Sequence, residues 1–90
     1  MEWHWDERKA GANVSKHGIP FELAVLVFKD PMQLTFPNDH PDDDRWETYG
    51  RVDVSTLVVV HTIYDDESGG RIISARRATA HERKAYEEGT

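Results

Sequence analysis

The C-terminal quarter of the chain gathers side chains that could hold a phosphodiester and move protons around it. Two consecutive arginines, Arg76 and Arg77, end a predicted strand, and a predicted helix follows at once with Glu82, Arg83 and Tyr86. A guanidinium matches the oxygens of a phosphate with two parallel hydrogen bonds and keeps its charge. Carboxylates and phenols can take or give a proton. These side chains therefore predict a small anion site at a strand–helix junction.

The two arginines cannot share one role, because successive side chains on a strand point to opposite faces. We expect one of Arg76 and Arg77 to face a cleft and the other to pair with an acidic neighbour; the alternative is a pair of exposed cations at a strand end. Glu82 follows Thr79 by three residues, which is the spacing of a helix capping box. The capping role competes with direct catalysis by Glu82, and it could also hold this carboxylate beside an arginine.

Further candidates lie on the predicted helices. Lys16 and His17 end the first predicted helix, where cations interact well with the helix C-terminus. Histidine is also a natural general base, so both residues are candidates for catalysis. Arg83 and Tyr86 lie three apart on one helical face and either contact the phosphodiester ligand or pack against the sheet.

The middle of the chain offers weaker candidates. Arg45 and Arg51 share the face of a predicted strand with Tyr49, where they could bind a phosphodiester ligand or could offset the negative charge of the acid-rich loop before them. His61 lies in an apolar strand, where a buried, hydrogen-bonded histidine is more common than a catalyst. A metal site in the loop of His40 and its neighbouring aspartates has no fixed ligand spacing to support it, so no metal site and no cofactor are expected.

Composition limits the class of protein. Ninety residues make one small domain, 1–90, with a thin core. The formal net charge is −6, with −8 in residues 30–67 and +2 in residues 71–90. This balance argues against bulk nucleic-acid binding but leaves room for a local anion site. There is no cysteine and no signal-peptide pattern, so we expect a complete, cytoplasmic chain without a membrane segment.

The elements that must position these groups are a short strand, two helices, a strand meander and a last helix. Asp6 and Gly18 bound the first helix, and Pro20 opens the second. Apolar and alternating patterns then predict the strands. We expect an α+β fold, a compact twisted antiparallel sheet with helices on one face. The expected strands are 2–5, 33–36, 45–52, 57–63 and 71–76, and the expected helices are 6–17, 20–28 and one after residue 79.

Several blocks in this layout resemble the BrnT family of bacterial type II toxins, over nearly the whole chain. The resemblance implies a RelE-like fold and a ribosome-independent ribonuclease that blocks translation. It also implies a cognate BrnA-like antitoxin, a small ribbon-helix-helix protein that neutralises the toxin in a heterotetramer and alone contacts operator DNA. The blocks that carry the resemblance are Trp3-His-Trp-Asp-Glu7, Asn13-Val-Ser-Lys-His-Gly-Ile-Pro-Phe-Glu-Leu-Ala24, Phe28-Lys-Asp-Pro31, Arg45-Trp-Glu-Thr-Tyr-Gly50, Leu57-Val-Val-Val-His-Thr62 and Arg71-Ile-Ile-Ser-Ala-Arg-Arg-Ala78.

Combined with the residue chemistry, the resemblance predicts metal-free RNA cleavage. One departure is the absence of an arginine just after Thr62, where Ile63 and Tyr64 stand instead. The alternatives are a binding module that acts only in a repressor complex, and direct DNA binding, which no long basic helix supports. The candidate catalytic residues are Arg76, Arg77, Lys16, His17, Glu82 and Tyr86, and the candidate RNA-binding residues are Arg45, Arg51, Arg71 and Arg83.

Overall fold

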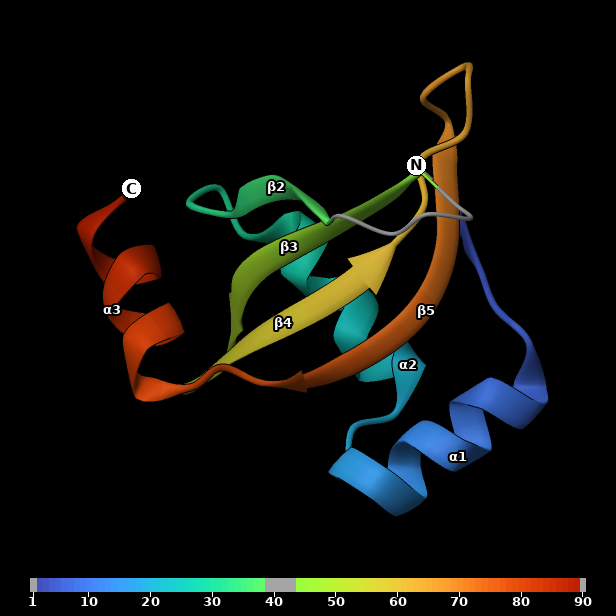
Figure 1. The fold of residues 1–90 in the computed structure, drawn as a ribbon, viewed down its shortest axis with the longest axis horizontal. Coiled ribbons are helices and arrows are strands. Elements are labelled where there is room, and N and C mark those ends of the chain that lie inside the picture. Colours follow the sequence, from blue (N-terminus) through green and yellow to red (C-terminus); the bar gives the residue numbers. More distant parts are fainter. Residues whose placement is uncertain (1, 39–43, 90) are drawn as a thin grey trace.

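A computed structural model describes residues 2–38 and 44–89 of the chain. Five strands form one sheet in the order β1-β5-β4-β3-β2 (Figure 1). The elements are β1 (Glu2–His4), α1 (Glu7–His17), α2 (Phe21–Ala24), a 3₁₀ helix η1 (Val25–Lys29), β2 (Leu34–Asn38), β3 (Arg45–Val52), β4 (Ser55–His61), β5 (Gly69–Arg77) and α3 (Ala80–Glu88).

The α+β prediction is confirmed, with one difference in the sheet. Strands β2 to β5 form an antiparallel meander, but β1 runs parallel to β5 and pairs only with residues 69–71. Helices α1 and α2 and the turn η1 cover one face of the sheet, while α3 lies at the end of the sheet beside β3 and β4 (Figure 1). None of the helices in the described part is long and apolar enough to cross a membrane.

The second helix, predicted over residues 20–28, is α-helical over a shorter range than its apolar pattern predicts. Residues 21–24 are α-helical, and Val25–Lys29 continue as a 3₁₀ helix. The close approach of this turn to β3 depends on Gly50, because a Cβ atom there would lie 2.6 Å from the Cβ of Val27. The 3₁₀ turn can pack this closely against β3 because Gly50 has no side chain.

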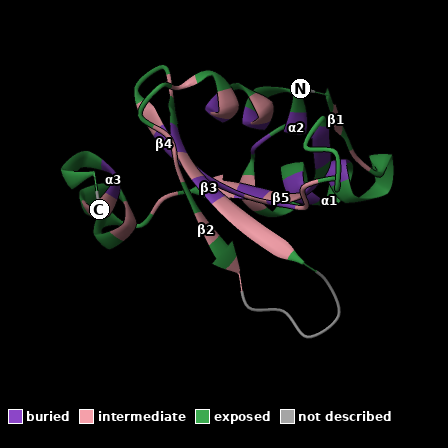
Figure 2. Cartoon of the chain, turned by 90° about the horizontal axis from the view of Figure 1, so that it is seen from above, coloured by how far each residue is buried: buried purple, intermediate pink, exposed green. Residues whose placement is uncertain are grey.

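The main cluster of buried residues lies between the sheet and the α1–α2 layer (Figure 2). One polar side chain joins them: Asn13 of α1 is 6% exposed and exchanges hydrogen bonds with the backbone N–H and C=O of Ala75, at 3.1 and 2.8 Å. Because β1 covers only the first part of β5, Asn13 satisfies edge groups of β5 that no strand reaches. The apolar core consists of Ala10, Ile19, Phe21, Ala24, Val27, Leu57, Val59, Ile72 and Ala75.

Candidate active site on the open face of the sheet

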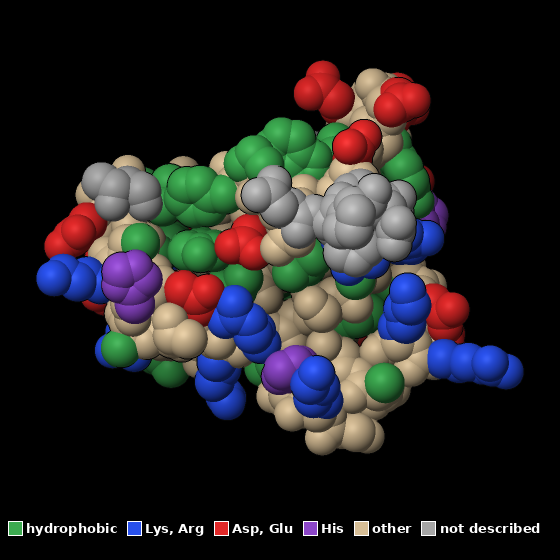
Figure 3. Space-filling view, in the orientation of Figure 1, with side chains coloured by type: hydrophobic (Ala, Val, Ile, Leu, Met, Phe, Trp, Pro, Cys, Tyr) green, Lys and Arg blue, Asp and Glu red, His purple; other side chains and the backbone are tan. Residues whose placement is uncertain are grey.

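The face of the sheet opposite α1 and α2, which we call the open face, presents two rows of side chains. The strand pairing sets the rows, since directly paired residues point to the same side. Figure 1 is viewed from this side, with α2 behind the sheet, and the same view in Figure 3 shows hydrophobic, acidic and basic side chains together. One row is Leu34, Tyr49, Val58 and Arg76, and the other is Phe36, Glu47, Val60 and Ser74.

Arg76 on β5 and Glu82 on α3 form a two-pronged ion pair. The Nη1–Oε1 and Nη2–Oε2 distances are 2.6 and 2.8 Å. Glu82 also completes the predicted capping box, because its Oε1 accepts a hydrogen bond from the backbone N–H of Thr79 at 2.8 Å. The hydrogen bond from Arg76 lowers the pKa of Glu82 to about 2, and the same contact raises the pKa of Arg76. Both groups are therefore charged at neutral pH, and the carboxylate is anchored at two points.

The pairing leaves part of the Arg76 guanidinium open to a ligand. Its side chain is 36% exposed, whereas that of Glu82 is 15% exposed. Glu82 occupies the end of the guanidinium, and among the described residues no hydrogen bond uses the Nε–H at its side. Arg77 is exposed on the next residue, as the alternation of the strand predicts. The structure thus separates the two arginines, one held by a carboxylate and one directed to solvent.

Tyr49 and Glu47 continue the polar surface on β3. The Tyr49 hydroxyl donates to Oε1 of Glu47 at 3.3 Å, and the amide of Asn38 donates to Oε2 at 2.8 Å. Burial, followed by the negative charge of Glu47, raises the pKa of Tyr49. The phenol is therefore protonated at neutral pH and is able to donate a hydrogen bond or a proton.

Lys16 and His17 lie beside Ile73 and Ser74 of β5. They line a shallow cavity of about 190 Å³ between α1 and β5, together with Ile73 and Ser74. Ser74 and Arg76 point to the same side of β5, about 7 Å apart along the strand. The end of α1 thus brings an exposed ammonium and a half-buried imidazole to the edge of the open face.

Tyr86 belongs to a separate cluster. It is 8% exposed, and its hydroxyl donates a short hydrogen bond to Oδ2 of Asp30. Burial raises the pKa of Asp30, but hydrogen bonds from Tyr86, Arg51 and Met32 outweigh burial, so the pKa is lowered overall. The Arg51 guanidinium lies 5.5 Å from the centre of the Tyr86 ring and 3.4 Å from Glu87. This cluster fastens α3 to the sheet beside a cavity of about 400 Å³.

The four predicted RNA-binding arginines are spread over the molecule. Strands β3 and β5 run in the same direction, so Arg45 and Arg71 lie at one end of the sheet and Arg51 lies at the other. Arg83 is exposed on α3. Tyr64, one of the two residues that stand where the resemblance would place an arginine after Thr62, is exposed, and its ring centre lies 6.1 Å from that of His4.

His61 is buried, as predicted, and lies on the helix-covered side. It is 1% exposed, and the rings of Trp3 and Phe28 meet it edge-on at 5.1 and 4.9 Å. Its Nε2 lies 2.7 Å from the Thr48 hydroxyl, and its Nδ1 lies 2.9 Å from the carbonyl oxygen of Thr62. Burial lowers the pKa of His61, which keeps the ring neutral.

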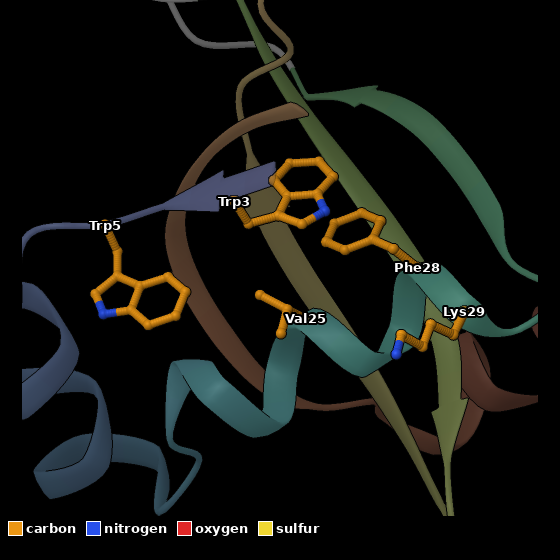
Figure 4. Close-up of a pocket in the computed structure, with 5 residues that line it drawn as sticks. All are labelled: Trp3, Trp5, Val25, Phe28 and Lys29. Carbon is orange, nitrogen blue, oxygen red and sulfur yellow. The ribbon is translucent and has the colours of Figure 1, made fainter. Parts of the chain in front are cut away.

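A second hollow, of about 510 Å³, opens on the helix-covered side (Figure 4). Trp3 stacks on Phe28 with ring centres 3.8 Å apart, and Trp5, Val25 and Lys29 complete the walls. The tryptophans are half-buried and pack against the core. The hollow and the Arg76–Glu82 pair therefore lie on different sides of the sheet.

Asp30 and Asn38 were not predicted as site residues, because their roles depend on contacts between distant segments. Tyr49 was on the predicted strand face, and Glu47, two residues earlier, shares that face by alternation, but the contact of Asn38 with Glu47 needed the register of β2 and β3. Within residues 2–38 and 44–89, no three His, Asp or Glu side chains are close enough to hold a metal ion. Most of the aspartate loop considered as a metal site, residues 39–43, lies outside the described residues.

Two of three comparisons with known proteins gave matches. The family model described as the ribonuclease toxin BrnT of type II toxin–antitoxin systems matches residues 5–82. The 1.1 Å crystal structure of the Brucella abortus ribonuclease toxin BrnT is similar at a TM-score of 0.71, with 28% sequence identity over 88% of this chain and 97% of that one. The comparison with curated proteins gave no match. The family model covers most of the chain, so this protein belongs to the BrnT family of ribonuclease toxins of type II toxin–antitoxin systems.

Proposed function

We propose that this toxin cleaves RNA without a metal ion, on the open face of the sheet, with Arg76 as the phosphate-binding residue. The observation that carries the proposal is the state of Arg76. Its guanidinium is held by an anchored carboxylate, yet more than a third of its side chain is exposed. A charged donor that is already oriented needs little reorganisation to stabilise charge on phosphoryl oxygens.

The reaction needs a base, a cation that stabilises the charge on the phosphoryl oxygens and an acid, and groups near Arg76 can supply all three. A base removes the proton from the 2′-OH, O2′ attacks phosphorus, and the bond from phosphorus to O5′ breaks. The products are a 2′,3′-cyclic phosphate and a 5′-hydroxyl. We assign the base to His17, with Lys16 adding positive charge beside it, and the proton for O5′ to the Tyr49 phenol. Glu82 acts as a positioning residue for Arg76.

The remaining candidates receive supporting roles. Arg45, Arg51, Arg71, Arg77 and Arg83 attract the RNA backbone from both ends of the sheet, a contribution that salt weakens. Tyr86 positions α3 through Asp30.

Membership in a type II toxin family implies a cognate antitoxin. We propose that it is a small BrnA-like ribbon-helix-helix protein that makes all contacts with operator DNA. The complex would be a heterotetramer of two toxins and two antitoxins, dimerised through the antitoxin and located in the cytoplasm. The mass of the copurified complex, measured by light scattering, tests this stoichiometry.

One observation favours the alternative, a binding module that has lost cleavage. The Glu82 carboxylate already occupies the end of the Arg76 guanidinium, where it competes with a phosphate. Under this alternative the chain would act only in the repressor complex, and the purified chain would leave RNA intact.

The test is cleavage of end-labelled RNA by the purified chain in EDTA. We expect cyclic-phosphate ends from the native chain, a loss of about 100-fold or more in Arg76→Ala, and a much smaller loss in Arg77→Ala. Arg77→Ala is the matched control because it removes the same charge one residue away. Intact RNA with a folded native sample would overturn the proposal in favour of the binding module.

A further inference from the structure

An aromatic pair lies on the open face beside the proposed phosphate site. Phe36 on β2 and Tyr49 on β3 have ring centres 5.3 Å apart and planes inclined by 66°. Both residues are half-buried. In an edge-to-face pair, at least one ring keeps a face that the other does not cover, and such a face can stack against an unpaired base.

The register places this pair within reach of Arg76. Tyr49 pairs with Val58, and Val58 pairs with Arg76, so two strand spacings, about 10 Å, separate the backbones of Tyr49 and Arg76. Tyr49 and Arg76 lie in one row of the open face, and the charges of Arg76 and Glu82 contribute to the pKa of the Tyr49 phenol. A nucleotide whose phosphate contacts Arg76 can therefore extend its base toward Phe36.

The polar group beside Phe36 selects among bases. Glu47 is the direct cross-strand partner of Phe36. Tyr49 and Asn38 each donate one hydrogen bond to Glu47, and these bonds fix its carboxylate beside the aromatic pair. An ionised carboxylate only accepts hydrogen bonds, and it has about four acceptor sites. Among the RNA bases, guanine alone presents two adjacent donors, N1–H and N2–H, on its Watson–Crick edge.

We propose that the open face contains a guanine-binding subsite, in which an unpaired guanine of RNA stacks on Phe36 and Tyr49 and donates to Glu47. The inference rests on the proposed function, because it takes the phosphate of that RNA to lie on Arg76. It makes single-stranded RNA the substrate and gives the cleavage site a base preference.

The test is the affinity for short oligonucleotides that cannot be cleaved. Fluorescently labelled 2′-O-methyl pentanucleotides of uridine, with guanosine, adenosine, cytidine or uridine at the centre, are titrated with the native chain. Fluorescence anisotropy should show tighter binding of the guanosine oligonucleotide. Phe36→Ala should weaken that binding by about 5- to 150-fold, the range expected for one lost stacking contact, whereas Phe36→Tyr should retain most of it.

Two further variants separate stacking from base reading. Glu47→Gln should keep binding but lose the preference for guanosine, because an amide offers a donor as well as an acceptor. Val54→Ala is the control, since it removes a 91% exposed apolar side chain from the β3–β4 turn, and it should change nothing. Equal affinity of the native chain for all four oligonucleotides, or unchanged binding by a folded Phe36→Ala variant, would overturn the subsite.

The outcomes also separate the subsite from the nuclease proposal. Guanosine preference in these oligonucleotides without cleavage of ordinary RNA in EDTA would support the subsite and overturn the nuclease. Cleavage without any base preference would support the nuclease and overturn the subsite.

Discussion

Two ionisable side chains on opposite faces of the sheet differ in charge, because His61 is neutral on one face and Glu82 is charged on the other. On the helix-covered face, His61 is enclosed by aromatic rings and its pKa is lowered, so it stays neutral. On the open face, Glu82 keeps its charge because Arg76 holds its pKa at about 2. Burial without a charged partner neutralises a group, whereas a partner at the surface keeps it ionised. We therefore expect stability to depend mainly on the helix-covered face and chemistry on the open face.

The hydrogen bonds of His61 show how completely the covered face satisfies its polar groups. A carbonyl oxygen cannot donate, so Nδ1 donates its proton to Thr62, and in the neutral ring Nε2 accepts from the Thr48 hydroxyl. Thr48 then accepts from Thr35, whose hydroxyl lies 2.8 Å away. This direction of the hydrogen bonds belongs to the neutral ring, which the lowered pKa of His61 favours.

The largest expected effect is on the covered face. His61→Ala should lower the free energy of unfolding by about 3 kcal/mol, because it removes a buried ring and one of the two side-chain hydrogen bonds of Thr48. Urea denaturation measures the loss, and RNA cleavage per folded molecule should stay the same. His4→Ala, an exposed histidine, is the control. A large fall in the cleavage rate of folded His61→Ala protein would break the division between the two faces.

The next effect is on the open face. Arg76→Lys keeps the charge but loses the planar fork, so RNA cleavage should fall by about 10- to 100-fold, equivalent to about 1.5–3 kcal/mol. Arg77→Lys should have little effect. Single-turnover cleavage rates compare the variants. Full activity of Arg76→Lys would mean that a positive charge suffices and that the geometry set by Glu82 is unimportant.

The free energy of unfolding should fall over a different pH range for each face of the sheet as the solution is acidified. The lowered pKa of His61 favours folding above the unfolded value of about 6.5, so its contribution is lost as the pH falls below that value. The Glu82 contribution is present above pH 4.5 and is lost as the pH falls toward 2.

Glu82→Gln should reduce the loss of stability below pH 4.5 and leave the loss below pH 6.5 unchanged, while Asp30, whose pKa is also lowered, still contributes at acidic pH. With allowance for solvent screening, the loss at neutral pH is about 1–2 kcal/mol. Unfolding free energies measured from pH 7 to pH 3 test this. The idea fails if Glu82→Gln has the same acid profile as the native chain below pH 4.5.

The smallest expected effect is at the junction of the two faces. Tyr86→Phe removes one hydrogen bond to Asp30, which keeps its backbone donors from Arg51 and Met32. We expect a loss of about 1 kcal/mol and faster amide hydrogen exchange in α3. Cleavage should change less than twofold. A loss as large as that of Arg76→Lys would instead place Tyr86 in the active site.

Much of this arrangement was predictable from local patterns. The capping box of Thr79 and Glu82, the end of α1 at Gly18 and the opposite directions of Arg76 and Arg77 follow from short spacings. The parallel pairing of β1 and the 3₁₀ turn after α2 did not follow, because both depend on packing between distant segments. Only part of the site was predicted from sequence. Arg76 and Glu82 could be grouped because they are six residues apart, whereas Tyr49 is brought to them only by the pairing of β3, β4 and β5.

The sequence by itself determined the element types, the exposed charge of the C-terminal quarter and the family blocks, since these depend on residues close together in the chain. The tertiary structure decided which charges meet. It put Glu82 on Arg76, Asp30 on Tyr86 and Asn13 on the edge of β5. The physical reason is that side-chain hydrogen bonds act over about 3 Å, so contacts between distant segments exist only once the sheet register has brought those segments together.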